Sequence, residues 1–144
     1  MPDIQTGSYR VIQFYPNVAT GEFVNVGIVM IDPYKNQIDV MLPDTLRELK
    51  KLCWVSEEML EIGIMEIKGF ISRLKHLSRI TTEPSDEYSR LIFSINEPSA
   101  YEFISEFYLK AGGHIQLKES LPCSVSNVDL TLKTLFYVLV ITLD

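Results

Sequence analysis

The chain has 144 residues, of which 47% are hydrophobic and 22% are charged. This composition is that of a globular protein and excludes a disordered chain, and the length suits one domain. The 13 basic and 19 acidic residues give a net charge of −6, without the basic excess that a nucleic-acid-binding surface needs. We therefore expect a single domain over residues 1–144 and no nucleic acid among its partners.

The two cysteines, Cys53 and Cys123, lie far apart in the sequence, and neither belongs to a CxxC pair. This usage is typical of buried thiols in a reducing compartment. The first residues lack the features of a signal peptide, and no apolar run approaches the roughly 20 residues that span a bilayer. The sequence therefore predicts a cytoplasmic location and no membrane contact.

Three β-strands are expected near 9–15, 22–31 and 36–42, where β-branched and aromatic residues are frequent. The links between them are short and rich in turn-forming residues, which predicts an antiparallel meander. A fourth strand is expected near 90–95, and one more short strand around 115–117.

After Pro43 the apolar residues recur at three- and four-residue spacing, which indicates helices. Helices are expected near 45–54, 57–79 and 99–111, and Ser56 is a suitable N-cap for the second. The fold class is therefore α+β, with the meander sheet packed against helices.

The last segment is ambiguous. Asn127 or Asp129 could cap a helix near 129–140, which has apolar residues at helical spacing. Its β-branched residues Val138 and Val140 also suit a strand.

The most distinctive string is YRVIQFYPNVATGEFVNVGIVMIDP, over residues 9–33. In an extended strand side chains alternate between faces, so Asn25 and Gly27 are expected to share one face, among apolar neighbours. If Gln13 lies opposite Asn25, the two amides can satisfy each other. Gly27 would allow another backbone or a ligand to approach closely.

Two interpretations of this motif are open. In the first, Asn25 bonds the backbone of the adjoining loop and Glu22 helps to order the turn. In the second, Glu22, Asn25, Gly27 and Arg10 form a binding site.

The sequence indicates no catalytic residue, metal site or cofactor. Its two histidines, His76 and His114, stand outside any metal-binding motif, and it contains neither GxxxxGK[ST] nor GxGxxG.

The string resembles the opening of a bacterial family catalogued as domain of unknown function 3037. Members have a strand, a proline-containing loop and a segment close to GEFVNVGVV. Here the pattern falls on Pro16, Gly21, Glu22, Phe23, Asn25, Gly27 and Val29. An arginine- and proline-rich stretch of many members is missing around 88–98. The resemblance implies a bacterial protein whose gene often neighbours a HipA-like kinase gene, and hence an accessory or regulatory role.

The leading hypothesis is a small protein-binding or accessory module of unassigned activity, linked to a defence or toxin-antitoxin kinase system. Its partner is expected to be a protein, and a second copy of the chain is a further candidate. The alternative is a small hydrolase or nucleic-acid enzyme that uses Glu22, Asn25 and Arg10. Convergence of these three residues on a pocket would favour the enzyme, whereas an exposed apolar patch would favour the binding module.

Overall fold

The structure is a computed structural model that describes residues 5–17, 19, 21–43, 56–82, 88–95, 98–109 and 114–141. Its strands are β1 (Thr6–Asn17), β2 (Glu22–Asp32), β3 (Gln37–Pro43), β4 (Arg79–Thr82), β5 (Tyr88–Ser94), β6 (Ile115–Leu117) and β7 (Leu121–Ser124). Its helices are α2 (Glu57–Leu77), α3 (Ser99–Leu109) and α4 (Val128–Phe136), and α4 continues into the π-helical turn η1 (Tyr137–Ile141).

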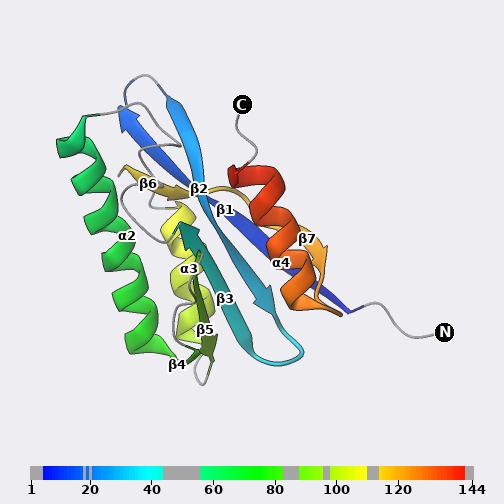
Figure 1. Cartoon of the computed structure of the whole chain (residues 1–144). Helices are drawn as coiled ribbons and strands as arrows, with labels where there is room; N and C mark the ends of the chain where they lie inside the picture. Colours follow the sequence, from blue (N-terminus) through cyan, green and yellow to red (C-terminus); the bar gives the residue numbers. More distant parts are fainter. Residues whose placement is uncertain are drawn as a thin grey trace.

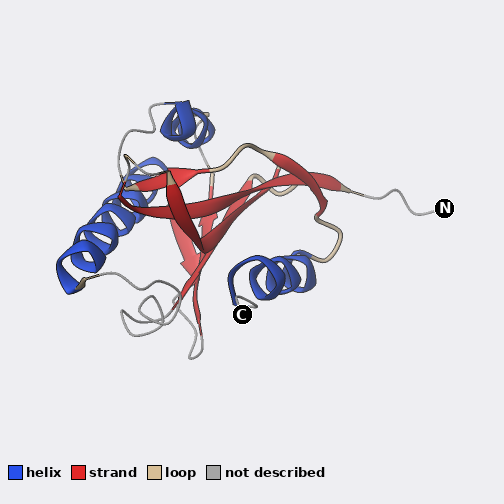
Figure 2. Cartoon of the chain, turned by 90° about the horizontal axis from the view of Figure 1, so that it is seen from above, coloured by secondary structure: helices blue, strands red, loops and turns tan. Residues whose placement is uncertain are grey.

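The described strands form one antiparallel sheet (Figure 1). Its order is β4-β5-β3-β2-β1-β6, and β7 also pairs with β1. Strands β1, β2 and β3 are direct neighbours, as the predicted meander requires. Helices α2 and α3 cover one face of the sheet, and α4 lies on the other face (Figure 2). The predicted α+β class is confirmed.

Each face of the sheet has its own hydrophobic core. The core under α2 and α3 includes Ile12, Phe14, Val29, Val40, Leu60, Leu74, Phe93 and Ile104. The core under α4 and η1 includes Val11, Ile28, Met30, Met41, Leu132, Phe136 and Val140. Strand β2 supplies both cores, and its residues from Val26 to Met30 are all buried. This double burial explains why the strand is almost continuously apolar.

The predicted long helix ends two residues early, at Leu77. Ser78 has an extended backbone, and its hydroxyl donates a hydrogen bond to the carbonyl of Leu74. The chain then enters β4, an edge strand that the sequence analysis did not predict. The predicted helix at 45–54 lies outside the described residues, as do the last two residues of the one at 99–111.

Strand β7 was also not predicted, and its second residue is Pro122. A proline within a short run argues against a strand in the middle of a sheet, since it has no N–H for the ladder. Among the described strands β7 pairs only with β1, so a missing N–H can be tolerated on its other side.

The ambiguous last segment is helical. Asn127 is its N-cap, and the side-chain oxygen of Asn127 accepts a hydrogen bond from the N–H of Leu130. Its core-facing residues are spaced by four: Val128, Leu132, Phe136 and Val140. On a helix with 3.6 residues per turn, such a row drifts by about 40° at each step. The wider turn of η1 compensates for this drift and returns Val140 to the sheet.

A β-bulge interrupts β2 within the motif. Ile12 pairs with Gly27 and Gln13 pairs with Asn25, so Val26 is an extra residue without a partner on β1. Gly27 therefore faces the core under α2 and α3, while Asn25 faces α4 and η1. The expectation that Asn25 and Gly27 share a face is wrong, because strict alternation does not hold across a bulge.

Replacing Gly27 by valine should destabilise the fold. A Cβ at this position would lie 2.7 Å from Cδ2 of Leu42 and 2.9 Å from the carbonyl oxygen of Met41. Overpacking of this kind costs about 1–3 kcal/mol, so the Tm of Gly27→Val should fall in thermal denaturation followed by circular dichroism.

Gly69→Ala is the matched control. A Cβ on Gly69 would meet nothing within 4 Å, and the residue lies inside α2. Alanine should therefore stabilise the protein by about 0.5–1 kcal/mol. If Gly27→Val kept the wild-type Tm, the close packing at the bulge would be refuted.

Candidate functional site

The structure does not bring the four predicted binding residues into one site. Glu22 is exposed at the start of β2, and Gly27 is buried in the core under α2 and α3. Arg10 pairs with Val29, whose side chain belongs to that same core. Because Asn25 faces η1, Arg10 and Asn25 lie on opposite faces of the sheet.

Asn25 anchors the C-terminal end of the last helix. Its amide oxygen accepts a hydrogen bond from Nε2 of Gln13 at 3.3 Å, and its Nδ2 donates to the carbonyl oxygen of Leu139 in η1 at 3.0 Å. The hydroxyl of Tyr15 donates to Oε1 of Gln13 at 3.0 Å. Gln13 lies opposite Asn25, and the two amides bond each other as expected for that register. The backbone that Asn25 bonds belongs to η1, however, and not to the adjoining loop.

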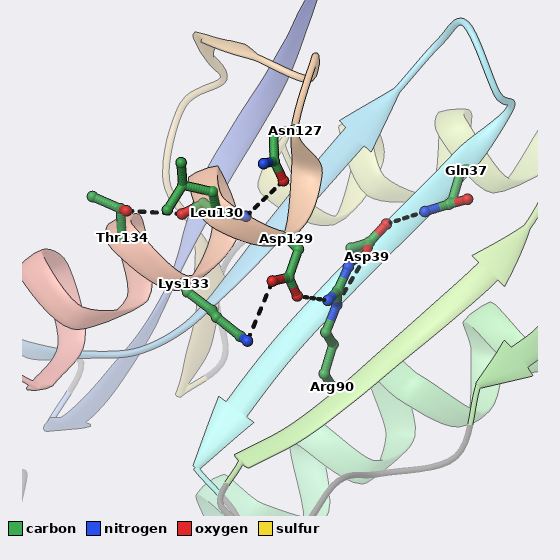
Figure 3. Close-up of polar contacts among 8 residues, drawn as sticks. All are labelled: Gln37, Asp39, Arg90, Asn127, Asp129, Leu130, Lys133 and Thr134. Carbon is green, nitrogen blue, oxygen red and sulfur yellow. Dashed lines mark hydrogen bonds and ion pairs between the residues drawn. The ribbon is translucent and has the colours of Figure 1, made fainter.

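A second group of polar side chains holds the N-terminal end of the same helix (Figure 3). Asp39 of β3 is 1% exposed, and its Oδ2 lies 2.7 Å from Nη2 and 3.2 Å from Nε of Arg90. Its other oxygen accepts a hydrogen bond from Nε2 of Gln37 at 2.8 Å. Arg90 also forms an ion pair with Asp129 in the first turn of α4. One guanidinium therefore links the buried centre of the sheet to the helix.

Asp129 and Lys133 continue this chain of alternating charges on α4. Nζ of Lys133 lies 3.3 Å from Oδ2 of Asp129, one helical turn away. The hydrogen bond from Lys133 and the nearby positive charges of Lys133 and Arg90 lower the pKa of Asp129 below its usual value. The carboxylate of Asp129 therefore stays ionised and available to Arg90 throughout the neutral pH range.

Asp39, Arg90 and their connection to Asp129 were not predicted from the sequence. Two signals were present in the sequence. An aspartate stands between Ile38 and Val40 in an otherwise apolar run, and an arginine opens the predicted strand at 90–95. A buried charge needs a partner, but the pairing of Met41 with Arg90 across β3 and β5 depends on the sheet order.

His114 and Glu66 form hydrogen bonds with backbone groups on the face of the sheet that α2 covers. The carboxylate of Glu66 accepts hydrogen bonds from the N–H groups of His114 and Ile115, which ties α2 to β6. Nδ1 of His114 lies 2.7 Å from the carbonyl oxygen of Tyr15, to which it must donate because a carbonyl can only accept. Both ionisable side chains are thus used to satisfy main-chain groups.

The described residues supply little for metal or thiol chemistry. Within them, no group of three or more histidine, cysteine, aspartate or glutamate side chains is placed to hold a metal ion. Cys123 is a partly buried free thiol whose pKa is raised by burial. Cys53 lies outside the described residues.

Among the residues that the structure describes, no helix combines the length and apolar character that crossing a membrane requires.

The outward side of α4 and η1 carries exposed apolar side chains. Leu130, Tyr137 and Val138 are 62%, 58% and 61% exposed. Thr134 lies between them, and its hydroxyl donates to the carbonyl oxygen of Leu130 at 2.8 Å. We call these four residues the outer stripe. The last helix is therefore apolar on two sides, one facing the sheet and one facing solvent.

Replacing Arg90 by leucine should destabilise the protein strongly, because it leaves the buried carboxylate of Asp39 without its cation. Breaking a buried ion pair in this way costs about 3–5 kcal/mol, which urea denaturation measures. The double variant Asp39→Leu/Arg90→Leu should recover much of this loss, since it removes both buried charges.

Lys133→Ala provides the matched control for Arg90→Leu. The pair of Lys133 with Asp129 is more than half exposed, so its loss should cost no more than about 0.5 kcal/mol. Equal effects of Arg90→Leu and Lys133→Ala would contradict a central role for Arg90.

Replacing Asn25 by aspartate should loosen the end of the last helix. The isosteric carboxylate places an oxygen where Nδ2 donates to the Leu139 carbonyl, so a hydrogen bond is replaced by repulsion. We expect a loss of about 1–3 kcal/mol and faster hydrogen exchange in η1. Glu22→Gln, at an exposed position of the same strand, should stay within about 0.5 kcal/mol of the wild type. The same stability for both variants would rule out the anchoring role of Asn25.

Comparisons with known proteins place this structure in a family. Neither the curated proteins nor the solved structures contain a match to the chain. A family model described as protein of unknown function (DUF3037) matches residues 9–140, which include the motif, nearly the whole sheet and nearly all of the last helix. The suspected resemblance is therefore confirmed over almost the whole chain, and the protein belongs to the DUF3037 family.

Proposed function

We propose that this chain is a single-domain protein-binding module of the cytoplasm without catalytic activity of its own, and that the outer stripe of α4 and η1 is its contact surface. The observation that carries the proposal is the exposure of Leu130, Tyr137 and Val138 on one helix. Single exposed apolar residues are normal on protein surfaces. A contiguous group on one element is the usual mark of an interaction surface.

The spacing of the outer stripe supports this proposal. Leu130, Thr134 and Val138 follow one another at four-residue intervals, and Tyr137 stands beside Val138. The residues between them that face the sheet are Leu132 and Phe136. The exposed residues and the buried residues of this helix have the same four-residue spacing. The wider turn of η1, which aligns the buried residues, therefore also aligns the exposed ones.

The anchoring of the helix also supports it. Arg90 holds the first turn of α4, and Asn25 holds the Leu139 carbonyl in η1. A contact surface that is held in place at both ends loses little conformational entropy when a partner binds. The polar contacts of the motif thereby contribute to binding without touching the partner.

The enzyme alternative gains no support from the geometry. It requires Glu22, Asn25 and Arg10 to converge, but Arg10 and Asn25 lie on opposite faces of the sheet. An accessory role beside a kinase of a defence or toxin-antitoxin system fits a binding module, and it rests on the family resemblance alone.

Capture of partners from a lysate of the cells that encode the protein tests this function. Tagged wild-type protein should retain a defined set of proteins, identified by mass spectrometry. The variant Leu130→Glu/Val138→Glu should lose them, because it places two charges in the stripe.

Met65→Glu is the matched control, since Met65 is 71% exposed on α2, which covers the other face of the sheet. This variant should retain the same proteins as the wild type. If the stripe variant captured the wild-type set as well, the outer stripe would not be the contact surface.

A further inference from the structure

Two buried aspartates in neighbouring strands differ in how their charges are compensated. Asp32 of β2 and Asp39 of β3 are each 1% exposed. Asp39 forms an ion pair with Arg90, and its other oxygen accepts a hydrogen bond from Gln37. Among the described residues, no basic side chain forms an ion pair with Asp32. Because a buried carboxylate without a counter-charge is unfavourable, a cation beside Asp32 would stabilise the fold.

One oxygen of the Asp32 carboxylate is used by the turn between β2 and β3. Its Oδ1 accepts hydrogen bonds from the N–H groups of Tyr34 and Lys35 at 2.9 and 3.3 Å. Its Oδ2 is buried and has no hydrogen-bond partner within the described part of the chain. The turn therefore holds the carboxylate in place through Oδ1 and leaves Oδ2 available to a ligand.

Two further oxygens lie at the same turn. Oδ1 of Asn36, the residue before β3, lies 3.5 Å from the hydroxyl oxygen of Tyr101 in the first turn of α3. The carbonyl of Asn36 accepts a hydrogen bond from the N–H of Ile95 at 2.8 Å, which holds the turn against the segment that leads into α3. The pKa of Tyr101 is raised above its usual value, first by burial and then by the negative charge of Asp32. The phenol of Tyr101 thus lies beside Asn36 and within the field of Asp32.

The distance between the Asn36 and Tyr101 oxygens fits a shared cation. At 3.5 Å it is longer than a normal hydrogen bond between oxygens. Two oxygens that bind one Ca²⁺ ion at right angles, each about 2.4 Å away, are about 3.4 Å apart. For Mg²⁺, with ligands at about 2.1 Å, the same separation would be about 3.0 Å. The two oxygens are therefore spaced for an ion of the size of Ca²⁺.

The chemistry of the three side chains also favours a cation over a water molecule. A water molecule could donate a hydrogen bond to Oδ2 of Asp32, but it would not compensate the charge. Carboxylate, amide and phenol oxygens are hard ligands, which suit hard cations. The site has a single carboxylate, so it differs from the clusters of three or more acidic, histidine or cysteine side chains that the described residues lack. With one charge and three protein ligands, binding should be weak, in roughly the millimolar range.

We propose that Asp32, Asn36 and Tyr101 form a weak cation site between the β2–β3 turn and α3, which binds an oxygen-coordinated ion of the size of Ca²⁺. The ion compensates the buried charge of Asp32 and links the turn to the helix, and water molecules supply its remaining ligands. The site is separate from the outer stripe, which lies on α4 and η1, so this inference does not depend on the proposed function.

Terbium luminescence of the whole chain tests the site. Tb³⁺ is close to Ca²⁺ in size, and it emits when an adjacent tyrosine transfers excitation energy to it. Titration of the wild type should give emission that saturates at one ion per chain, and CaCl₂ should displace the ion more effectively than MgCl₂. Asp32→Asn keeps an oxygen for the turn but removes the charge, so it should raise the Kd for Tb³⁺ by about tenfold or more. Tyr101→Phe should lose most of the emission.

Tyr137→Phe is the matched control for Tyr101→Phe, because Tyr137 is 58% exposed on η1. Glu61→Gln removes an exposed carboxylate of α2 and is the control for Asp32→Asn. Both controls should bind Tb³⁺ and emit like the wild type. If the wild type gave no saturable emission, or if Asp32→Asn and Tyr101→Phe behaved like their controls, the site would be refuted.

Thermal denaturation gives a second readout that needs no lanthanide. Millimolar CaCl₂ should raise the Tm of the wild type above its value in choline chloride of equal ionic strength, because the ion binds the folded chain. The Tm of Asp32→Asn should not respond to CaCl₂, and in choline chloride it should be at least that of the wild type, since a buried charge without a counter-ion has been removed. A wild-type Tm that is the same in both salts, or an equal response of Asp32→Asn, would overturn the proposal.

Discussion

Strand β2 is buried on both faces, and this constraint requires a layer of helix on each side of the sheet. Val29 packs under α2 and α3, whereas Ile28 and Met30 pack under α4 and η1. Without the second layer, the apolar side chains of β2 that face α4 would be exposed to water, at a cost of about 25 cal/mol for each Å2. The last helix is therefore an integral part of the fold.

Polar contacts fix the position of the last helix on the sheet, which the apolar contacts of this second layer leave undetermined. Leu132, Phe136 and Val140 attract the helix to the sheet, but apolar contacts have little directionality. The bridge from Asp39 through Arg90 fixes the first turn, and Asn25 fixes η1. Because its inner side and both ends are held in place, the helix presents the outer stripe in a fixed position. This arrangement connects the buried polar groups to the proposed interaction surface.

The family motif has an explanation in these contacts. Gly27 accepts the close approach of the Leu42 side chain and the Met41 carbonyl at the bulge, and Asn25 joins β1 to η1 through Gln13. The close approach requires the missing side chain of Gly27, and the two hydrogen bonds require the amide of Asn25, which the apolar neighbours in the strand lack. Glu22, by contrast, is exposed at the start of β2. The motif therefore builds the sheet and positions the helix, while the proposed contact surface lies elsewhere in the chain.

The amino-acid sequence was sufficient to predict the α+β class, the meander of β1 to β3 and the long helix capped by Ser56, because local periodicity and short turns encode these features. It left open whether the last segment is helix or strand, since β-branched residues suit both. The bulge at Val26, the partners of Asp39 and the second apolar side of α4 became apparent only in the folded chain. These depend on the order of strands and on which surfaces remain uncovered, and both are set by contacts between residues far apart in the sequence.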